Sequence, residues 1–81
     1  MSRLLAMVEC RIEESMRQAY LAGLDARKAK ASASGAHFWV FEHAGQPGRF
    51  IEFTEAGSEA VVRATTGTEP SQGLWREVKG A

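Results

Sequence analysis

The chain has 81 residues, enough for a single domain over 1–81, and its ten basic residues are balanced by ten acidic ones. The neutral balance removes the main electrostatic argument for binding nucleic acid, and a single cysteine excludes an intrachain disulfide. No cysteine–histidine cluster has zinc spacing and no apolar stretch is long enough to span a membrane. We therefore expect a cytoplasmic protein without metal or other cofactor, whose marginal core is supplemented by a partner chain.

The N-terminal part predicts a strand followed by a helix. Residues Leu4–Ile12 alternate with the period of a strand, although their Leu, Ala, Met and Glu content also favours a helix. A helix is expected from Glu13 to about Ala31, and Gly35 is expected to end it. The side chains predicted to form its buried face are Met16, Ala19, Tyr20, Gly23 and Leu24.

The middle of the chain predicts a β-hairpin. Residues Ala36–His43 and Arg49–Glu55 favour strands, and the segment Ala44–Gly48 between them is rich in turn formers. If His43 pairs with Arg49, one face carries Trp39, Phe41, Ile51 and Phe53. The other face then carries Phe38, Val40 and Phe50 together with Glu42, Glu52 and Thr54.

The C-terminal part is less clear. Residues Ser58–Thr66 favour a short helix by a narrow margin, because Ser58 can cap a helix while the β-branched residues favour a strand. A loop over Gly67–Gly73 and a short final strand over Leu74–Val78 follow. The order β-α-β-β-α-β predicts an α+β, ferredoxin-like fold with an antiparallel sheet. A helix plus a β-meander is the alternative, if Ser58–Thr66 is a strand.

The first strand of the hairpin is apolar on both sides, so both faces of the sheet need cover. The helix is expected to cover one face through Met16, Tyr20 and Leu24. The second face, with Phe38 and Val40 or their neighbours, then has no cover within the chain. We therefore expect a homodimer formed through this second sheet face.

Residues Phe38–Glu42, the loop Gln46–Gly48 and the strand Arg49–Glu55 resemble the dimeric α+β barrel superfamily, in particular its small antibiotic-biosynthesis-monooxygenase-like members. The resemblance implies two ferredoxin-like subunits packed sheet against sheet, with a small pocket between sheet and helices. Such proteins include cofactor-independent oxygenases of aromatic polyketides, haem-degrading enzymes and isomerases. This chain departs from them because it has no asparagine and no histidine on the first helix.

Two hypotheses for function follow. In the first, the chain is an oxygenase-like enzyme that acts on a small aromatic or quinone substrate, with His37 and Trp39 catalytic and Phe41, Trp75 and Tyr20 in contact with the substrate. A histidine can act as a base near neutral pH, but a histidine at the end of a strand is more often simply solvated. The tryptophans are likewise more often part of a core or an interface than of a substrate pocket. In the second, the chain is a non-catalytic dimeric binding or assembly module, because it is short and shows no catalytic constellation.

Overall fold

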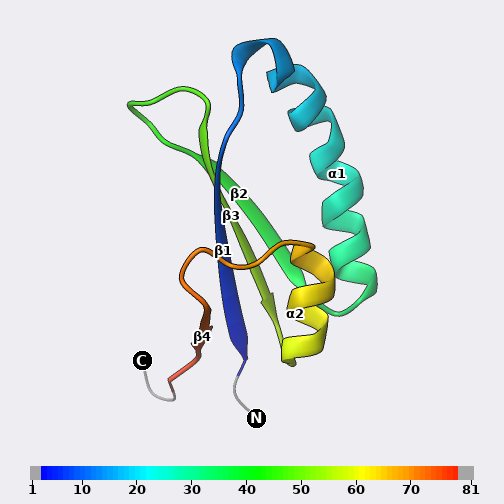
Figure 1. Ribbon diagram of the computed structural model, residues 1–81. Helices are drawn as coiled ribbons and strands as arrows, with labels where there is room; N and C mark the ends of the chain where they lie inside the picture. The colour runs from blue at the N-terminus through cyan, green and yellow to red at the C-terminus, as the bar shows by residue number, and fades with distance from the viewer. Residues whose placement is uncertain (1–2, 79–81) are drawn as a thin grey trace.

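Strands and helices alternate along the chain in the predicted order β-α-β-β-α-β (Figure 1). The computed structural model describes residues 3–78. Its strands are β1 (Leu4–Arg11), β2 (His37–Glu42), β3 (Arg49–Ala56) and β4 (Leu74–Arg76). Its helices are α1 (Arg17–Ala33), which follows a 3-10 turn at Glu14–Met16, and α2 (Glu59–Thr66). The predicted boundaries therefore hold to within a few residues, and the main difference is the later start of α1.

The strands form one antiparallel sheet in the order β2-β3-β1-β4. This order confirms the ferredoxin-like fold and rules out the helix-plus-meander alternative, because residues 59–66 are helical and β1 separates β3 from β4. The predicted hairpin register is also confirmed, since the His43 N–H donates to the Arg49 carbonyl over 2.8 Å. Trp39 accordingly lies opposite Phe53, and Phe41 opposite Ile51.

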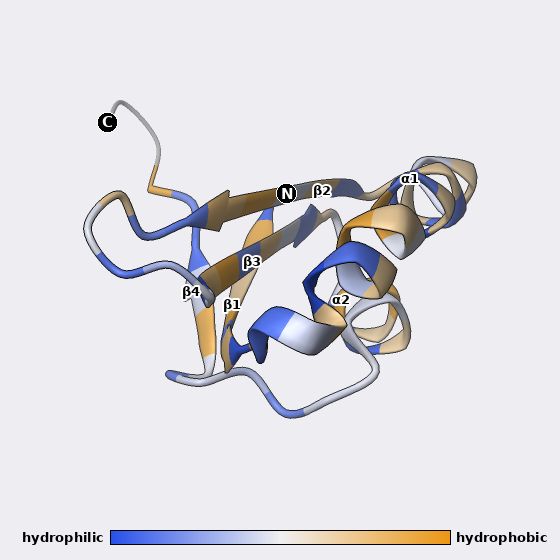
Figure 2. Cartoon of the chain, turned by 90° about the horizontal axis from the view of Figure 1, so that it is seen from above, coloured by the Kyte–Doolittle hydropathy of each residue, from blue (hydrophilic) through white to orange (hydrophobic). Residues whose placement is uncertain are grey.

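Both helices lie on the same side of the sheet (Figures 1 and 2). They cover the face that carries Phe38 and Phe50, which are 5% and 3% exposed. Of the two alternatives for the uncovered face, Phe38 and Val40 or their neighbours, the second holds: it is Trp39 and Phe41 that no helix within residues 3–78 covers. The β1-α1-β2 crossover decides which face α1 covers, and a strand that is apolar on both sides does not indicate which face that is.

The predicted inner face of α1 is only partly correct. Tyr20 and Leu24 are half-buried, as expected, but Met16 is 56% exposed in the 3-10 turn and Ala19 and Gly23 are exposed. Arg17 and Arg27 turn inward instead, because each reaches a glutamate on the sheet. A search for apolar periodicity does not find a helix face that is partly built from ion pairs.

The space between helices and sheet is filled largely by small side chains. The buried apolar residues are Ala6, Ala31, Ala36, Phe38, Phe50, Ala56 and Val62, and the largest fully buried side chains are Val62 and Thr54. Four of these apolar residues are alanines, which bury little area each. The core of this single chain is therefore small.

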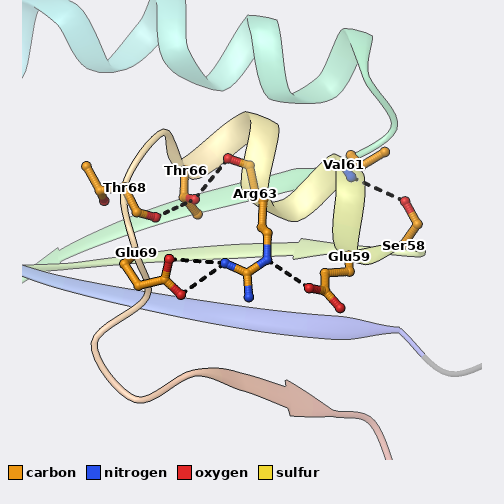
Figure 3. Close-up of polar contacts among 7 residues, drawn as sticks. All are labelled: Ser58, Glu59, Val61, Arg63, Thr66, Thr68 and Glu69. Atoms are coloured by element: carbon orange, nitrogen blue, oxygen red, sulfur yellow. Dashed lines mark hydrogen bonds and ion pairs between the residues drawn. The ribbon is translucent and has the colours of Figure 1, made fainter.

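Local hydrogen bonds fix α2 and the loop that follows it (Figure 3). The Ser58 hydroxyl accepts from the Val61 N–H over 3.3 Å, which is a helix N-cap, and Gly67 ends the helix with a positive φ of 69°. The Arg63 guanidinium donates to Glu59 on the same helix and to Glu69 in the loop, over 2.8 and 3.0 Å. These bonds hold the loop that leads to β4 against α2.

Candidate functional site

Large apolar side chains gather on the side of the sheet away from the helices. We call this surface the open face, and its apolar side chains are Leu5, Met7, Trp39, Phe41, Ile51, Phe53 and Trp75. Trp39, Phe41 and Trp75 are 45%, 56% and 48% exposed. In Figure 2, β2 is orange over much of its length, β3 alternates between orange and blue, and both helices lie on one side of the sheet. Within residues 3–78, no helix covers this apolar layer.

One end of the open face is hollowed into a groove of about 450 Å³. Trp39 on β2 and Trp75 on β4 line its two sides, with Leu5 and Glu55 between them. The strand spacing places β2 about 14 Å from β4, because two strands lie between them. The groove therefore has two indole walls and a floor that is part apolar and part carboxylate.

Polar groups border the groove on the side of β2. The His37 ring stacks on Trp39, with 5.8 Å between ring centroids and planes 18° apart. His37 Nε2 lies 3.9 Å from one oxygen of Glu55, and Arg3 forms an ion pair with the other. An exposed imidazole beside a carboxylate can donate a proton to a molecule held in the groove or accept one from it.

The opposite end of the open face has a second, smaller groove of about 230 Å³. Phe41 and Ile51 line it together with His43 and an Arg49–Glu9 ion pair of 2.7 Å. His43 accepts from the Gly45 N–H over 3.0 Å, so its Nδ1 already has a partner in the turn. The two histidines therefore lie at opposite ends of the face and beside different grooves.

A polar network lies on the other side of the sheet, beneath α1. The Glu52 carboxylate is 7% exposed and accepts two bonds of 2.9 Å from Arg27. It also accepts from the Tyr20 hydroxyl over 2.6 Å and from the Cys10 thiol over 3.8 Å. The Arg27 guanidinium lies 4.7 Å from the centroid of the Phe38 ring. Each polar group in this network is bound to another member of it.

The network sets the protonation state of its members. Burial alone raises the pKa of Glu52, but the bonds from Arg27 and Tyr20 outweigh burial and the pKa lies below its usual value. Burial and the bond to Glu52 raise the pKa of the Tyr20 phenol far above its ordinary range. Burial also raises the pKa of Cys10, so the thiol stays protonated and is a poor nucleophile. The arrangement is that of a structural ion pair.

The structure brings only some of the predicted site residues together. Trp39 and Trp75 line the larger groove, His37 stacks on Trp39 beside it, and Phe41 lies further along the same face. Tyr20 lies on the far side of the sheet, bound to Glu52. The sequence reasoning did not single out Glu55, which stands opposite His37; the predicted register already implied that pairing.

Glu42 forms a second ion pair between sheet and helix. It accepts from Arg17 over 2.7 Å and from the Gly48 N–H over 2.9 Å. These bonds, the one from Arg17 foremost, lower the pKa of Glu42 from 4.5 to about 2. The pair fastens the end of the β2–β3 hairpin to the start of α1.

Glu42 should make the stability of the fold pH-dependent in acid. Because its pKa is lower in the folded than in the unfolded chain, its stabilising contribution is complete above pH 4.5 and is lost as the pH falls toward 2. We expect Glu42→Gln to reduce the change in unfolding free energy across that window, measured by urea denaturation at a series of pH values. Glu13→Gln, at an exposed residue without an ion pair within 3–78, is the control and should follow the wild type.

Comparison with known proteins identifies the fold. No family model and no curated protein matches the sequence. A solved structure from Nitrosomonas europaea, described as a "putative antibiotic biosynthesis monooxygenase", superimposes with a TM-score of 0.71 at 12% sequence identity, covering 98% of this chain and 89% of the other. The chain therefore has the fold of an antibiotic-biosynthesis-monooxygenase-like protein, and the resemblance of its hairpin is confirmed at the level of the fold.

Two further properties of residues 3–78 bear on the kind of site. None of their helices is both long and apolar enough to cross a membrane. Their His, Cys, Asp and Glu side chains form no group of three or more that could hold a metal ion.

Proposed function

We propose that the chain acts as a single-domain subunit of a homodimer whose two open faces pack together, and that this dimer binds a small flat aromatic molecule in the groove between Trp39 and Trp75. One observation carries the proposal: large apolar side chains, among them Trp39, Phe41 and Trp75, stand exposed on the open face, whereas four of the seven buried apolar residues of the core are alanines. Monomeric proteins seldom leave a large contiguous apolar surface exposed to solvent.

The energetics favour a second copy as the cover. Full burial of a large apolar side chain stabilises by about 1.5–3 kcal/mol, so covering Phe41 and the apolar side chains of the open face outside the groove adds several kcal/mol to a marginal core. One ion pair stands at each end of the open face, Arg3–Glu55 at one end and Arg49–Glu9 at the other. Such charged groups are typical of the polar rim of an interface. The likeness to an antibiotic-biosynthesis-monooxygenase-like fold supports the same sheet-on-sheet arrangement.

The dimer is tested by a charge placed on the open face. We expect the wild-type chain to have twice its single-chain mass by size-exclusion chromatography with light scattering, and Phe41→Glu to have the mass of one chain, because a carboxylate cannot be buried there without a partner. Leu21→Glu is the matched control, since Leu21 is 40% exposed on α1 and lies away from the sheet face. A wild type with the mass of one chain at all concentrations would overturn the proposal.

The ligand is tested through the two tryptophans of the chain. We expect a naphthol to change the indole fluorescence saturably. We expect Trp75→Ala to weaken its binding by at least about fivefold, because stacking of an aromatic side chain on a base-sized ring contributes about 1–3 kcal/mol. Tyr20→Phe should leave the affinity unchanged, since Tyr20 lies on the opposite side of the sheet. Equal affinity in Trp75→Ala and wild type would place the ligand elsewhere.

An oxygenase-type reaction without a bound metal is the second candidate. The fold likeness favours it, as does the exposed His37 beside the groove. The network of Tyr20, Arg27 and Glu52 weighs against it, because it occupies the space beneath α1 where the resemblance implies a substrate pocket. Consumption of dioxygen in the presence of an aromatic hydroquinone, abolished by His37→Ala, would favour the oxygenase. Binding of naphthol without any consumption of dioxygen would favour the non-catalytic binding module.

A further inference from the structure

The groove between Trp39 and Trp75 has a floor and two sides, but the part of the chain within 3–78 gives it no roof. Every residue that lines it belongs to one of the four strands or directly flanks one, as Arg3 and Glu77 do. Binding sites for small molecules commonly enclose about 70–90% of the ligand surface. A flat molecule in this groove is covered from below and from the sides by one chain, and its outer side is left open.

The groove is continuous with the apolar surface that the proposed dimer buries. The strand register places Met7, Phe53 and Trp39 side by side in one row across the open face. Leu5 and Trp75 stand side by side in the next row, which lies about 7 Å away, because each residue of a strand adds about 3.4 Å. Strands β1 and β3 are eight residues long, so the open face of a second copy extends much further than one row. A copy that covers the first row therefore overhangs the groove as well.

We infer that the second copy forms the roof of the groove, so that each ligand site is complete only in the dimer. The inference rests on the proposed homodimer and its proposed ligand. Trp39 belongs to both surfaces, because it stands in the buried row and also on the wall of the groove. An interface with two-fold symmetry uses the same surface of both copies, so each copy covers the groove of the other.

This arrangement links ligand binding to dimerisation. Without a ligand, the dimer encloses an unfilled groove of about 450 Å³ in each copy, and the side chains that line an unfilled space lack contact partners on that side. A flat aromatic molecule fills the space and contacts both copies. Because the coupling between two binding events is reciprocal, the ligand tightens the dimer by the factor by which dimerisation tightens the ligand.

The test is the dissociation constant of the dimer, measured by analytical ultracentrifugation with and without saturating naphthol. We expect naphthol to lower this constant by at least about fivefold, which is the small end of the usual range for coupled sites. Phe41→Ala brings a tight dimer into the measurable range, because Phe41 lies on the open face and lines only the smaller groove at its opposite end. In Trp75→Ala, the same concentration of naphthol should change the constant less, because one wall of the groove is lost.

The reciprocal measurement uses Phe41→Glu, the variant expected to have the mass of one chain. We expect it to bind naphthol at least about fivefold more weakly than the wild-type dimer, although the substitution lies outside the larger groove. Leu21→Glu, on α1, is the control and should bind naphthol as the wild type does. If Phe41→Glu does not fold, dilution of Phe41→Ala below its dimer dissociation constant should produce the same loss of affinity.

Three results would overturn the inference alone. If naphthol binds the dimer without changing its dissociation constant, one chain completes the site, and the proposed dimer and ligand stand. If naphthol loosens the dimer, the ligand and the second copy compete for the groove. Equal affinity for naphthol in Phe41→Glu and the wild type would leave the second copy no part in the site. A wild type with the mass of one chain at all concentrations, with and without naphthol, would overturn the proposed homodimer and the inference together.

Discussion

Replacing Glu52 with alanine is expected to lower the free energy of unfolding by about 2–4 kcal/mol. The change leaves Arg27 and the Tyr20 hydroxyl beneath α1 without the carboxylate that both of them contact. The loss of an ion-pair partner that is 7% exposed is costly, although the partial exposure of Arg27 moderates the cost. The measurement is urea denaturation near neutral pH, followed by far-UV circular dichroism.

The exposed pair of Glu59 and Arg63 provides the matched control. Both residues lie on α2 and bond over 2.8 Å, but neither is buried. We expect Glu59→Ala to cost no more than about 0.5 kcal/mol. A double variant, Glu52→Leu with Arg27→Met, should cost less than Glu52→Ala alone, because no buried charge is left unpaired. Equal losses for Glu52→Ala and Glu59→Ala would show that the network beneath α1 does not stabilise the fold.

Replacing Gly48 with alanine is expected to cost about 2–4 kcal/mol. Gly48 has a φ of +86°, and a Cβ there would lie 2.7 Å from the Ile12 carbonyl oxygen. Ile12 cannot retreat without loss, because its own N–H donates to the Gly48 carbonyl over 2.8 Å. The substitution would therefore strain both the hairpin and the end of β1. We expect Gly48→Ala to have a lower Tm than the wild type in thermal unfolding.

Gly45 in the same turn is the control for Gly48. An added Cβ at Gly45 meets only the His43 ring, at 3.7 Å, which is an ordinary contact. Gly45→Ala should therefore change the unfolding free energy by less than about 0.5 kcal/mol. If Gly48→Ala and Gly45→Ala lower the free energy of unfolding equally, the positive φ of Gly48 and its close approach to Ile12 do not determine the stability of the turn.

Local patterns in the sequence were sufficient for the order of the elements, but the hairpin register rested on the assumption that His43 pairs with Arg49. The structure contains this pairing, which places Glu55 opposite His37. The ambiguity at residues 59–66 is resolved by the Ser58 cap and the left-handed Gly67, which outweigh the β-branched residues of α2.

Two features could not be predicted because they depend on contacts between distant segments. The face of the sheet that α1 covers follows from the handedness of the crossover, which the two-sided apolar pattern of β2 does not record. From the sequence, Arg27 is expected to be a solvated charge near the end of the helix. Its inward position depends on the bond to Glu52, which lies far away in the sequence. The sequence hypothesis already assigned Trp39 and Trp75 to one site, and the pairing of β4 with β1 places them on two sides of one groove.

The central claim, that the open face is an interface between two copies, is tested most directly by isotope-filtered NMR. In a mixture of 13C-labelled and unlabelled chains, only contacts between copies give filtered nuclear Overhauser signals. We expect these signals from the rings of Trp39 and Phe41 and from the methyl groups of Ile51 and Met7, all of which lie on the open face. Signals confined to α1 or α2, or none at all at concentrations where the protein is soluble, would contradict the claim.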